Sequence, residues 1–409
     1  MKNRVIIIGG GAAGLMAAGV AAKNGNDVTV IERNERPARK LMITGKGRCN
    51  ITNHAELDTL IKSTPGNGRF LYSAFSRFSP TDLIKLLEDL GLPLKVERGN
   101  RVFPVSDKAV DAVDALVKHA RQNGAKLLHG RAEKLVIEKE AITAVLLEDG
   151  GSIPCDRVIV ATGGLSYPGT GSTGDGYILA QQAGHTIRDT RASLVPLNVH
   201  EGFVTELMGL SLKNISIQVI DTKKNKEIYQ DFGELLFTHF GLSGPVILSA
   251  SAHMREPEEG RYKIMIDLKP ALDYNQLDGR LMKDFEKNLN RDFINALDEL
   301  LPRKLIPVII RLSRIPPHTK VNQITKEQRT GLCVLLKALT FHITSTRSVE
   351  EAVITAGGVN IKEIDPKTMG SKVIGNLFFA GEVMDVDAYT GGFNLQIAFS
   401  TGFVAGNSV

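Results

Sequence analysis

The hydrophobic pattern at the start of the chain predicts two strands with a helix between them. Residues 5–8 are four consecutive β-branched apolar residues, which is typical of a strand buried on both faces in a parallel sheet. A run rich in alanine and glycine through Ala22 predicts a helix, and the apolar segment Asp27–Glu32 predicts a second strand. This order favours an α/β fold.

Two amphipathic helices and a set of short strands are expected next. Ser79 can cap a helix whose first residue is Pro80, because serine suits the cap and proline suits the first turn. A second helix is predicted from about Asp107 to Asn123. Apolar and polar residues then alternate in short segments over residues 126–154, which predicts an antiparallel meander.

The pattern divides the chain into an α/β domain and an inserted region. Buried strands running into glycine are expected at residues 156–164 and again at 376–382. Between them the sequence changes to many short strands and turns, followed by charged helical segments. We therefore expect residues 1–190 and 349–409 to form one Rossmann-like domain with a parallel sheet and an antiparallel meander. Residues 191–348 form the insertion, rich in strands over 191–270 and helical over 271–348.

A glycine motif lies where the first strand meets the first helix. Gly9, Gly11 and Gly14 give the spacing G-x-G-x-x-G, and Glu32 ends the second strand. The first glycine permits a tight turn, the second lets a pyrophosphate approach the backbone, and the third lets helix and strand pack closely. A carboxylate at this distance accepts the hydroxyls of an adenosine ribose. The motif therefore favours FAD or NAD over NADP.

Composition adds mainly exclusions. The net charge is +5 over 409 residues, which is too mild to indicate nucleic acid as a partner. Three scattered cysteines without a C-x-x-C pair fit a reducing cytoplasm. The nine histidines show no metal-ligand spacing. The apolar run of residues 5–22 resembles an export signal, but the glycine motif explains it as folded core. We expect a cytoplasmic protein with no metal and no membrane partner.

Five further motifs carry a family resemblance, at residues 40–53, 101–104, 163–174, 237–245 and 391–396. With them the chain resembles the HI0933-like family of bacterial flavoproteins over essentially its whole length. Residues 161–164 and 173–176 are more remotely similar to the flavoprotein subunits of succinate dehydrogenase and fumarate reductase. The resemblance implies an FAD cofactor and a β-barrel-like fold for the strand-rich part of the insertion.

The motifs and the resemblance together assign a cofactor site. Lys40 and Arg48 are expected to meet phosphate or flavin carbonyls, and Glu382 stands where related FAD proteins usually have aspartate near the ribityl chain. A helix beginning within 391–396 would direct its free N–H groups at the pyrimidine edge of the flavin. The predicted cofactor residues are Gly9, Gly11, Ala13, Gly14, Glu32, Arg33, Arg39, Lys40, Gly45, Gly47, Arg48, Cys49, Asn50, Ala132, Ala161, Thr162, Gly163, Gly381, Glu382, Gly391, Gly392, Asn394 and Leu395.

The expected function is an FAD-dependent oxidoreductase acting on a small organic substrate. His239, in a glycine-rich turn of the insertion, is the candidate catalytic residue, whereas Cys49 is interpreted mainly as a packing residue. Two electron routes stay open: NAD(P)H as a transient donor, or reduction by the substrate itself followed by reoxidation by oxygen. An RNA-modifying flavoprotein and a non-catalytic flavin sensor are the alternative functions.

Overall fold

The computed structural model describes residues 2–255 and 257–409, which form two compact units. Unit 1 combines residues 1–193 with 348–409, and unit 2 spans 194–347. Each unit encloses a hydrophobic core of its own. Among the described residues, none of the helices is both long and apolar enough to cross a membrane. No group of three metal-ligating side chains occurs among them either.

Unit 1 is built around a five-stranded parallel sheet in the order β19-β10-β1-β2-β6. Ile7 at the centre pairs with Val30 on one side and Ile159 on the other, and all three side chains are fully buried. This double burial explains the continuous apolar runs in the sequence. The strands are β1 (Arg4–Ile8), β2 (Asp27–Glu32), β6 (Lys126–His129), β10 (Arg157–Val160) and β19 (Leu377–Phe379).

One strand of this sheet was expected in the meander. β6 pairs in parallel with β2, with His129 opposite Glu32, so the predicted meander over 126–154 was too long by one strand. Most of β6 is exposed because it lies at the sheet edge, and such a strand shows the same alternation as a meander strand. The antiparallel meander itself consists of β7 (Ala132–Glu138), β8 (Ala141–Leu147) and β9 (Ser152–Pro154).

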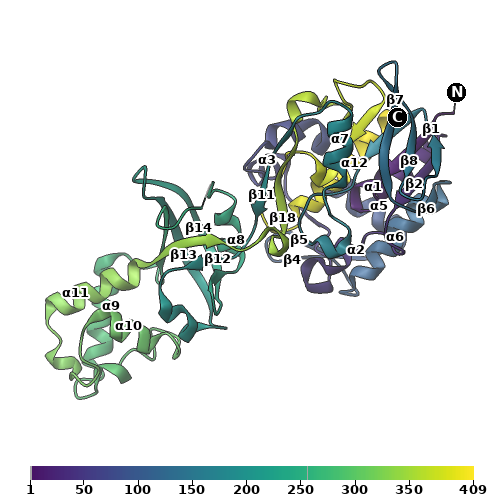
Figure 1. The fold of residues 1–409 in the computed structure, drawn as a ribbon. Helices are drawn as coiled ribbons and strands as arrows, with labels where there is room; N and C mark the ends of the chain where they lie inside the picture. Colours follow the sequence, from purple (N-terminus) through teal and green to yellow (C-terminus); the bar gives the residue numbers. More distant parts are fainter. Residues whose placement is uncertain (1, 256) are drawn as a thin grey trace. The chain divides into compact units, whose positions relative to one another are not determined.

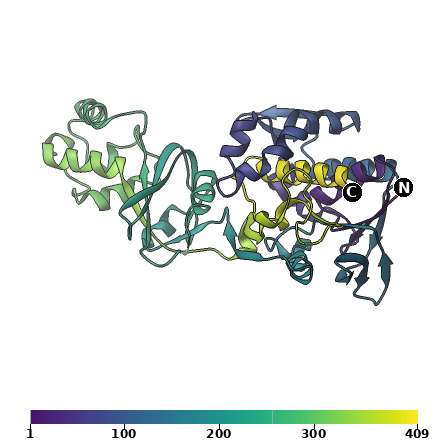
Figure 2. The same cartoon turned by 90° about the horizontal axis from the view of Figure 1, so that it is seen from above.

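Helices cover the parallel sheet. α1 (Ala12–Lys23) packs against both α12 (Phe393–Ser408) and α6 (Ala109–Gln122), and Figures 1 and 2 show α1 running beside the yellow α12. α5 (Pro80–Asp89) begins with the predicted cap, since Ser79 and Asp82 exchange the two hydrogen bonds of a capping box. The remaining helices of unit 1 are α2 (Arg39–Ile43), α3 (Leu57–Lys62), α4 (Tyr72–Arg77) and α7 (Asp175–Gln182).

Two small antiparallel sheets complete unit 1. The order β3-β5-β4 joins Thr52–Asn53, Arg101–Pro104 and Leu94–Glu97. β11 (Ile187–Ser193) pairs with β18 (Ile354–Val359), with Ser193 opposite Ile354. The chain thus leaves unit 1 and returns to it along two paired strands.

Unit 2 contains a closed antiparallel barrel, which confirms the barrel-like insertion. Its order is β12-β15-β14-β13-β16-β17, for the strands Leu197–Val199, Gly241–Ser243, Lys226–Phe237, Ser211–Asp221, Tyr262–Asp267 and Leu339–Thr346. β17 lies within 271–348, which was expected to be mostly helical. Leu339, Phe341 and Ile343 are buried at alternate positions, which is the strand period of two. The helices are α8 (Pro245–Ser251), α9 (Tyr274–Glu286), α10 (Ile306–Ser313) and α11 (Lys326–Lys337).

Candidate functional site

The glycine loop after β1 forms a tight turn with one open side. Gly9 has a φ of +103°, and a Cβ there would lie 2.6 Å from the carbonyl oxygen of Ala161. A Cβ on Gly14 would lie 1.9 Å from the Gly9 carbonyl oxygen, whereas a Cβ on Gly11 would meet nothing within 4 Å. Gly9 and Gly14 therefore close the turn, and Gly11 leaves its backbone open to a ligand. Ala13 follows in the first turn of α1 and is buried.

Glu32 ends β2 directly beside this loop. The backbone N–H of Gly10 donates to its Oε2 at 2.8 Å, and the backbone and side-chain amides of Asn34 donate to its Oε1 at 2.8 and 2.7 Å. An ionised carboxylate has about four acceptor positions. Three protein bonds therefore orient the group and still leave Oε2 able to accept from a ligand hydroxyl.

Two predicted cofactor residues carry buried polar atoms without a partner. Thr162 Oγ1, just after β10, and Asn50 Oδ1 form no hydrogen bond within the described part of the chain. Such orphaned groups cost free energy unless something pairs with them. Ala161 and Gly163 flank Thr162, so one unsatisfied atom lies at the strand end beside the Gly9 turn.

Tyr177, which the sequence did not single out, adds a third unpaired polar atom in the same region. Its hydroxyl is buried in α7 without a partner among the described residues. Burial, with the nearby charges of Glu382 and Asp385, raises the pKa of this phenol. It is therefore a neutral group that can donate one hydrogen bond.

Glu382 is the centre of a half-buried ion-pair network. Lys40 Nζ donates to its Oε2 at 2.6 Å, while the Ser166 hydroxyl and the backbone N–H of Thr355 donate to its Oε1 at 3.0 and 2.9 Å. Lys40 also donates to Ser166 at 2.6 Å. Gly381 precedes Glu382 with a φ of +76°, so the turn after β19 uses the left-handed conformation that favours glycine.

Ser166 and Thr355 are members of this network that the sequence analysis missed. Ser166 lies inside the glycine-rich motif of residues 163–174, and Thr355 lies in β18 before two glycines of positive φ. Both motifs were detectable as backbone features. The Ser166 hydroxyl reaches Glu382 across 216 positions of the chain, and the Thr355 hydroxyl accepts from the Ser166 N–H across 189, so these contacts have no local signal.

The segment 391–396 places the start of α12 at the edge of the site. Gly391 and Gly392 have φ values of +117° and +101°, and a Cβ on Gly392 would lie 2.4 Å from the backbone of Thr52. The first turn of the helix contains no acidic residue. The N–H groups at its start are therefore free to stabilise negative charge.

Hydrogen bonds fix this helix start from both sides. Asn394 accepts from the Ala388 N–H at 2.8 Å and donates to the Ala388 carbonyl at 2.7 Å. Asn53 Nδ2 donates to the Gly391 carbonyl at 3.0 Å. Gln396 is fully buried and accepts from the Thr52 hydroxyl at 2.5 Å. Leu395, between these ties, is half-buried.

The basic residues that were predicted to bind the cofactor are held by other side chains, mostly by carboxylates. Arg48 is paired with Glu97 and Asp107, which raise the pKa of the guanidinium, and it lies 4.2 Å from the ring centroid of Phe103. Arg33 donates to Thr173 and Asp175, and Arg39 donates to Asn34. A phosphate contact by Arg48 would have to compete with two carboxylates. Lys40 is likewise paired with a carboxylate, that of Glu382.

The other predicted cofactor residues contribute mainly backbone. A Cβ on Gly45 would lie 2.9 Å from the Asn50 N–H, whereas Gly47 faces open space. Cys49 is fully buried, and burial raises the pKa of its thiol to about 12, so it is an unreactive packing residue. Ala132 begins β7, two residues after Gly130, whose N–H donates to the Glu32 carbonyl.

His239 lies in unit 2, whereas every other predicted site residue lies in unit 1. It is an exposed residue between β14 and β15. Its ring contacts Phe240 edge to face, with centroids 5.0 Å apart. The helix expected after it begins at Pro245.

Comparison with known proteins identifies the family. Residues 3–408 match the model described as HI0933-like protein Rossmann domain. The chain is 32% identical to the ribosomal RNA dihydrouridine synthase of Escherichia coli, with 97% of this chain and 95% of the relative aligned. It is 31% identical to the 3-dehydro-bile acid delta(4,6)-reductase of Clostridium scindens, with 99% and 98% aligned.

A solved structure of related fold is the 3-ketosteroid delta1-dehydrogenase of Sterolibacterium denitrificans in complex with 1,4-androstadiene-3,17-dione. It has a TM-score of 0.53 at 13% identity and covers 99% of both chains, which shows a shared fold. The matched domain model and the two relatives of similar length show that the chain belongs to the HI0933-like family of FAD-binding oxidoreductases.

Proposed function

We propose that unit 1 holds FAD and that the protein reduces a carbon–carbon double bond conjugated to a carbonyl group. The observation that carries the cofactor assignment is the convergence at one sheet edge of the open Gly11 turn, the ribose acid Glu32 and the unpaired polar atom of Thr162. Asn50 and the start of α12 extend the same cradle. FAD bound here would supply an isoalloxazine ring that accepts and delivers a hydride.

The reaction class rests on what two relatives have in common. A delta(4,6)-reductase acts on double bonds conjugated to a steroid ketone, and dihydrouridine formation saturates a double bond conjugated to a uracil carbonyl. In both, a hydride adds to the carbon β to the carbonyl and a proton adds to the α carbon. We propose NAD(P)H as the donor: NAD(P)H, a proton and the conjugated alkene give NAD(P)⁺ and the saturated carbonyl compound.

The residues of this chain have distinct tasks in that scheme. The Glu32 carboxylate and the Gly9–Gly14 turn hold the adenosine half of the cofactor. The free N–H groups at the start of α12 stabilise negative charge at the pyrimidine edge of the ring. His239 is proposed to supply the proton, because an imidazole is a general acid near neutral pH.

The test is a pair of matched substrates. NADPH and NADH consumption is measured with 2-cyclohexenone and with 3-cyclohexenone, whose double bond is not conjugated. We expect consumption with the conjugated compound, formation of cyclohexanone and little turnover of the other isomer. Equal rates, or consumption that requires only oxygen, would refute the reaction class.

A histidine variant tests the proton donor. His239→Gln should keep full FAD content and lower the turnover number by roughly 10²-fold, which is the lower range for general acid catalysis. His318→Gln is the control, since His318 is another exposed histidine of unit 2. If both variants turn over at the parent rate, the proton comes from elsewhere.

A uracil ring in RNA is the second candidate substrate. Its support is the near-complete alignment with a ribosomal RNA dihydrouridine synthase. The reduced protein is incubated separately with RNA and with 2-cyclohexenone to distinguish the two candidates. Only a protein that acts on RNA would yield dihydrouridine on nucleoside analysis of that RNA.

A further inference from the structure

Charge is distributed unevenly within the helical part of unit 2. Residues 300–340 contain eight lysines and arginines but only one acidic residue, Glu327. Acidic residues gather instead between Asp267 and Glu299. The mild overall charge of the chain gave no indication of a nucleic-acid partner. That average conceals a basic segment containing α10 and α11.

Part of this basic charge is neutralised and part is not. Arg329 pairs with Asp278, Lys337 with Asp267, and Lys320 with Asp292. Arg303, just before α10, and Arg314, at its end, are exposed and have no acidic partner in the described chain. Lys304 and Lys326 are also exposed and have no acidic partner in the described chain. The unpaired positive charge therefore lies at the two ends of α10 and at the start of α11.

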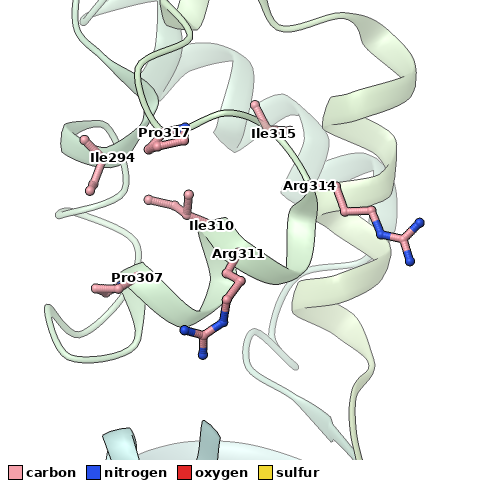
Figure 3. A pocket seen from close by; sticks show the side chains of 7 residues that line it. All are labelled: Ile294, Pro307, Ile310, Arg311, Arg314, Ile315 and Pro317. Atoms are coloured by element: carbon pink, nitrogen blue, oxygen red, sulfur yellow. The ribbon is translucent and has the colours of Figure 1, made fainter.

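An open pocket of about 450 Å³ lies along the same helix. Figure 3 shows the aliphatic side chains of Ile294, Ile310 and Pro317 gathered around it, with the guanidinium groups of Arg311 and Arg314 extending outward. Arg311 is held by Glu206 through two hydrogen bonds, at 3.2 and 2.9 Å. An apolar floor with arginines at its rim suits a ligand that has both a flat apolar part and phosphate charge.

We propose that this α10 surface docks single-stranded RNA, with phosphates on Arg303 and Arg314 and an unstacked base against the apolar pocket. Single-stranded nucleic acids are held by basic surfaces that follow the backbone together with side chains against which bases pack. At α10 this packing surface is aliphatic rather than aromatic. Phosphate contacts position the strand without reading its sequence. The inference rests on the second candidate substrate above and adds the place where the RNA binds.

The experiment compares two double variants of the full protein with its cofactor bound. Binding of a fluorescent single-stranded RNA is measured by anisotropy at several salt concentrations. R303Q/R314Q removes two charges from the surface, and K224Q/K226Q removes two from the exposed β13–β14 turn of the barrel. FAD content and the thermal midpoint show that both variants are folded.

We expect R303Q/R314Q to bind at least tenfold more weakly than the parent and K224Q/K226Q to bind within twofold of it. The slope of log affinity against log salt should fall by about 1.4 in R303Q/R314Q, since each single-strand phosphate contact contributes about 0.7. The parent should also prefer the single strand to a duplex of equal length. No RNA binding by the parent, equal loss in both variants, or tighter binding to anionic lipid vesicles than to RNA would overturn the proposal.

Reoxidation of the reduced flavin by 2-cyclohexenone separates this surface from the proposed chemistry. If the enone reacts but RNA does not bind, the α10 surface is wrong and the reductase stands. If RNA binds at α10 but no conjugated alkene reacts, the reductase is wrong and the surface stands.

Discussion

At the scale of single residues, the site depends on side chains whose orientation is fixed by several bonds. Glu32 receives hydrogen bonds from Gly10 and Asn34, and Glu382 receives them from Lys40, Ser166 and Thr355. Polar groups buried with such partners lose little freedom when a ligand binds. Preorganisation of this kind favours affinity because less ordering is left for the binding step.

Glu32→Ala should weaken FAD binding by about 1–3 kcal/mol, which is the cost of losing a hydrogen bond to a charged group. The measurement is the dissociation constant for FAD added to protein from which the cofactor was removed. Asp27→Asn, at the half-buried start of the same strand, is the control and should bind FAD as the parent does. Unchanged affinity in Glu32→Ala would mean that the ribose is held by another residue.

Asp387 gives a prediction about pH. Its carboxyl is 5% exposed and accepts from the Ser193 hydroxyl at 2.8 Å. Burial raises its pKa, and the Ser193 bond and Arg191 oppose that effect only in part, while Asp385 and Glu382 add to it. The pKa of Asp387 is therefore higher in the folded protein than in the unfolded chain. Its carboxyl contributes fully to the free energy of unfolding below the unfolded-state pKa, near 3.9, and this contribution is lost as the pH rises through the folded-state pKa.

Asp387→Asn should therefore stabilise the protein at pH 8, by about 1 kcal/mol, and have a smaller effect at pH 4.5. Thermal unfolding of parent and variant across this range measures the difference. Asp89→Asn, at the exposed end of α5 and outside the set of charges that act on Asp387, is the control. A stabilisation that does not grow with pH would show that Asp387 is not a destabilising buried carboxylate.

At the scale of elements, the sequence predicted those whose signal is local and missed those whose signal is tertiary. The Gly9–Gly14 turn, the cap at Ser79 and the start of α12 all follow from a few adjacent residues, and the structure contains each of them. β6 was predicted to join the antiparallel meander, and β17 lies in a region that was predicted to be helical. An alternation of apolar residues does not reveal which strand lies alongside. The partners of Glu382 were missed for the same reason.

Gly392→Val tests the proposal that the start of α12 faces the flavin. The new side chain would collide with Thr52 and strain a residue whose φ is +101°. We expect lower FAD occupancy and a more negative reduction potential of the flavin that remains, because the helix N–H groups are displaced from the ring. Gly209→Val is the control: its φ is +83°, its Cβ meets nothing within 4 Å, and it lies in unit 2. If both variants keep the parent potential, α12 does not contact the ring.

At the scale of the whole molecule, the two units each have a hydrophobic core and contain different proposed functional residues. Unit 1 contains the predicted cofactor residues, and unit 2 contains His239 and the α10 surface. The chain leaves unit 1 after Ser193 and returns through β18, where Ile354 pairs with Ser193. A short connection could therefore replace unit 2 without pulling the parallel sheet apart.

Replacing residues 194–347 by a short glycine–serine linker should leave a folded, yellow protein that retains FAD but does not turn over 2-cyclohexenone. The absorbance spectrum and the circular dichroism of the shortened chain measure this outcome. A colourless but folded product would show that unit 2 contributes directly to holding the cofactor.

The central claim is that a flavin in unit 1 passes electrons to a conjugated double bond. Its most direct test is one anaerobic titration followed by visible absorbance. The protein is first bleached with NADPH or NADH and then mixed with 2-cyclohexenone, and the released cofactor is identified after denaturation. We predict that the flavin bleaches, that its colour returns on addition of the enone with formation of cyclohexanone, and that the cofactor is FAD. A reduced flavin that stays bleached with every conjugated substrate and recovers only in air, or a cofactor other than FAD, would contradict the claim.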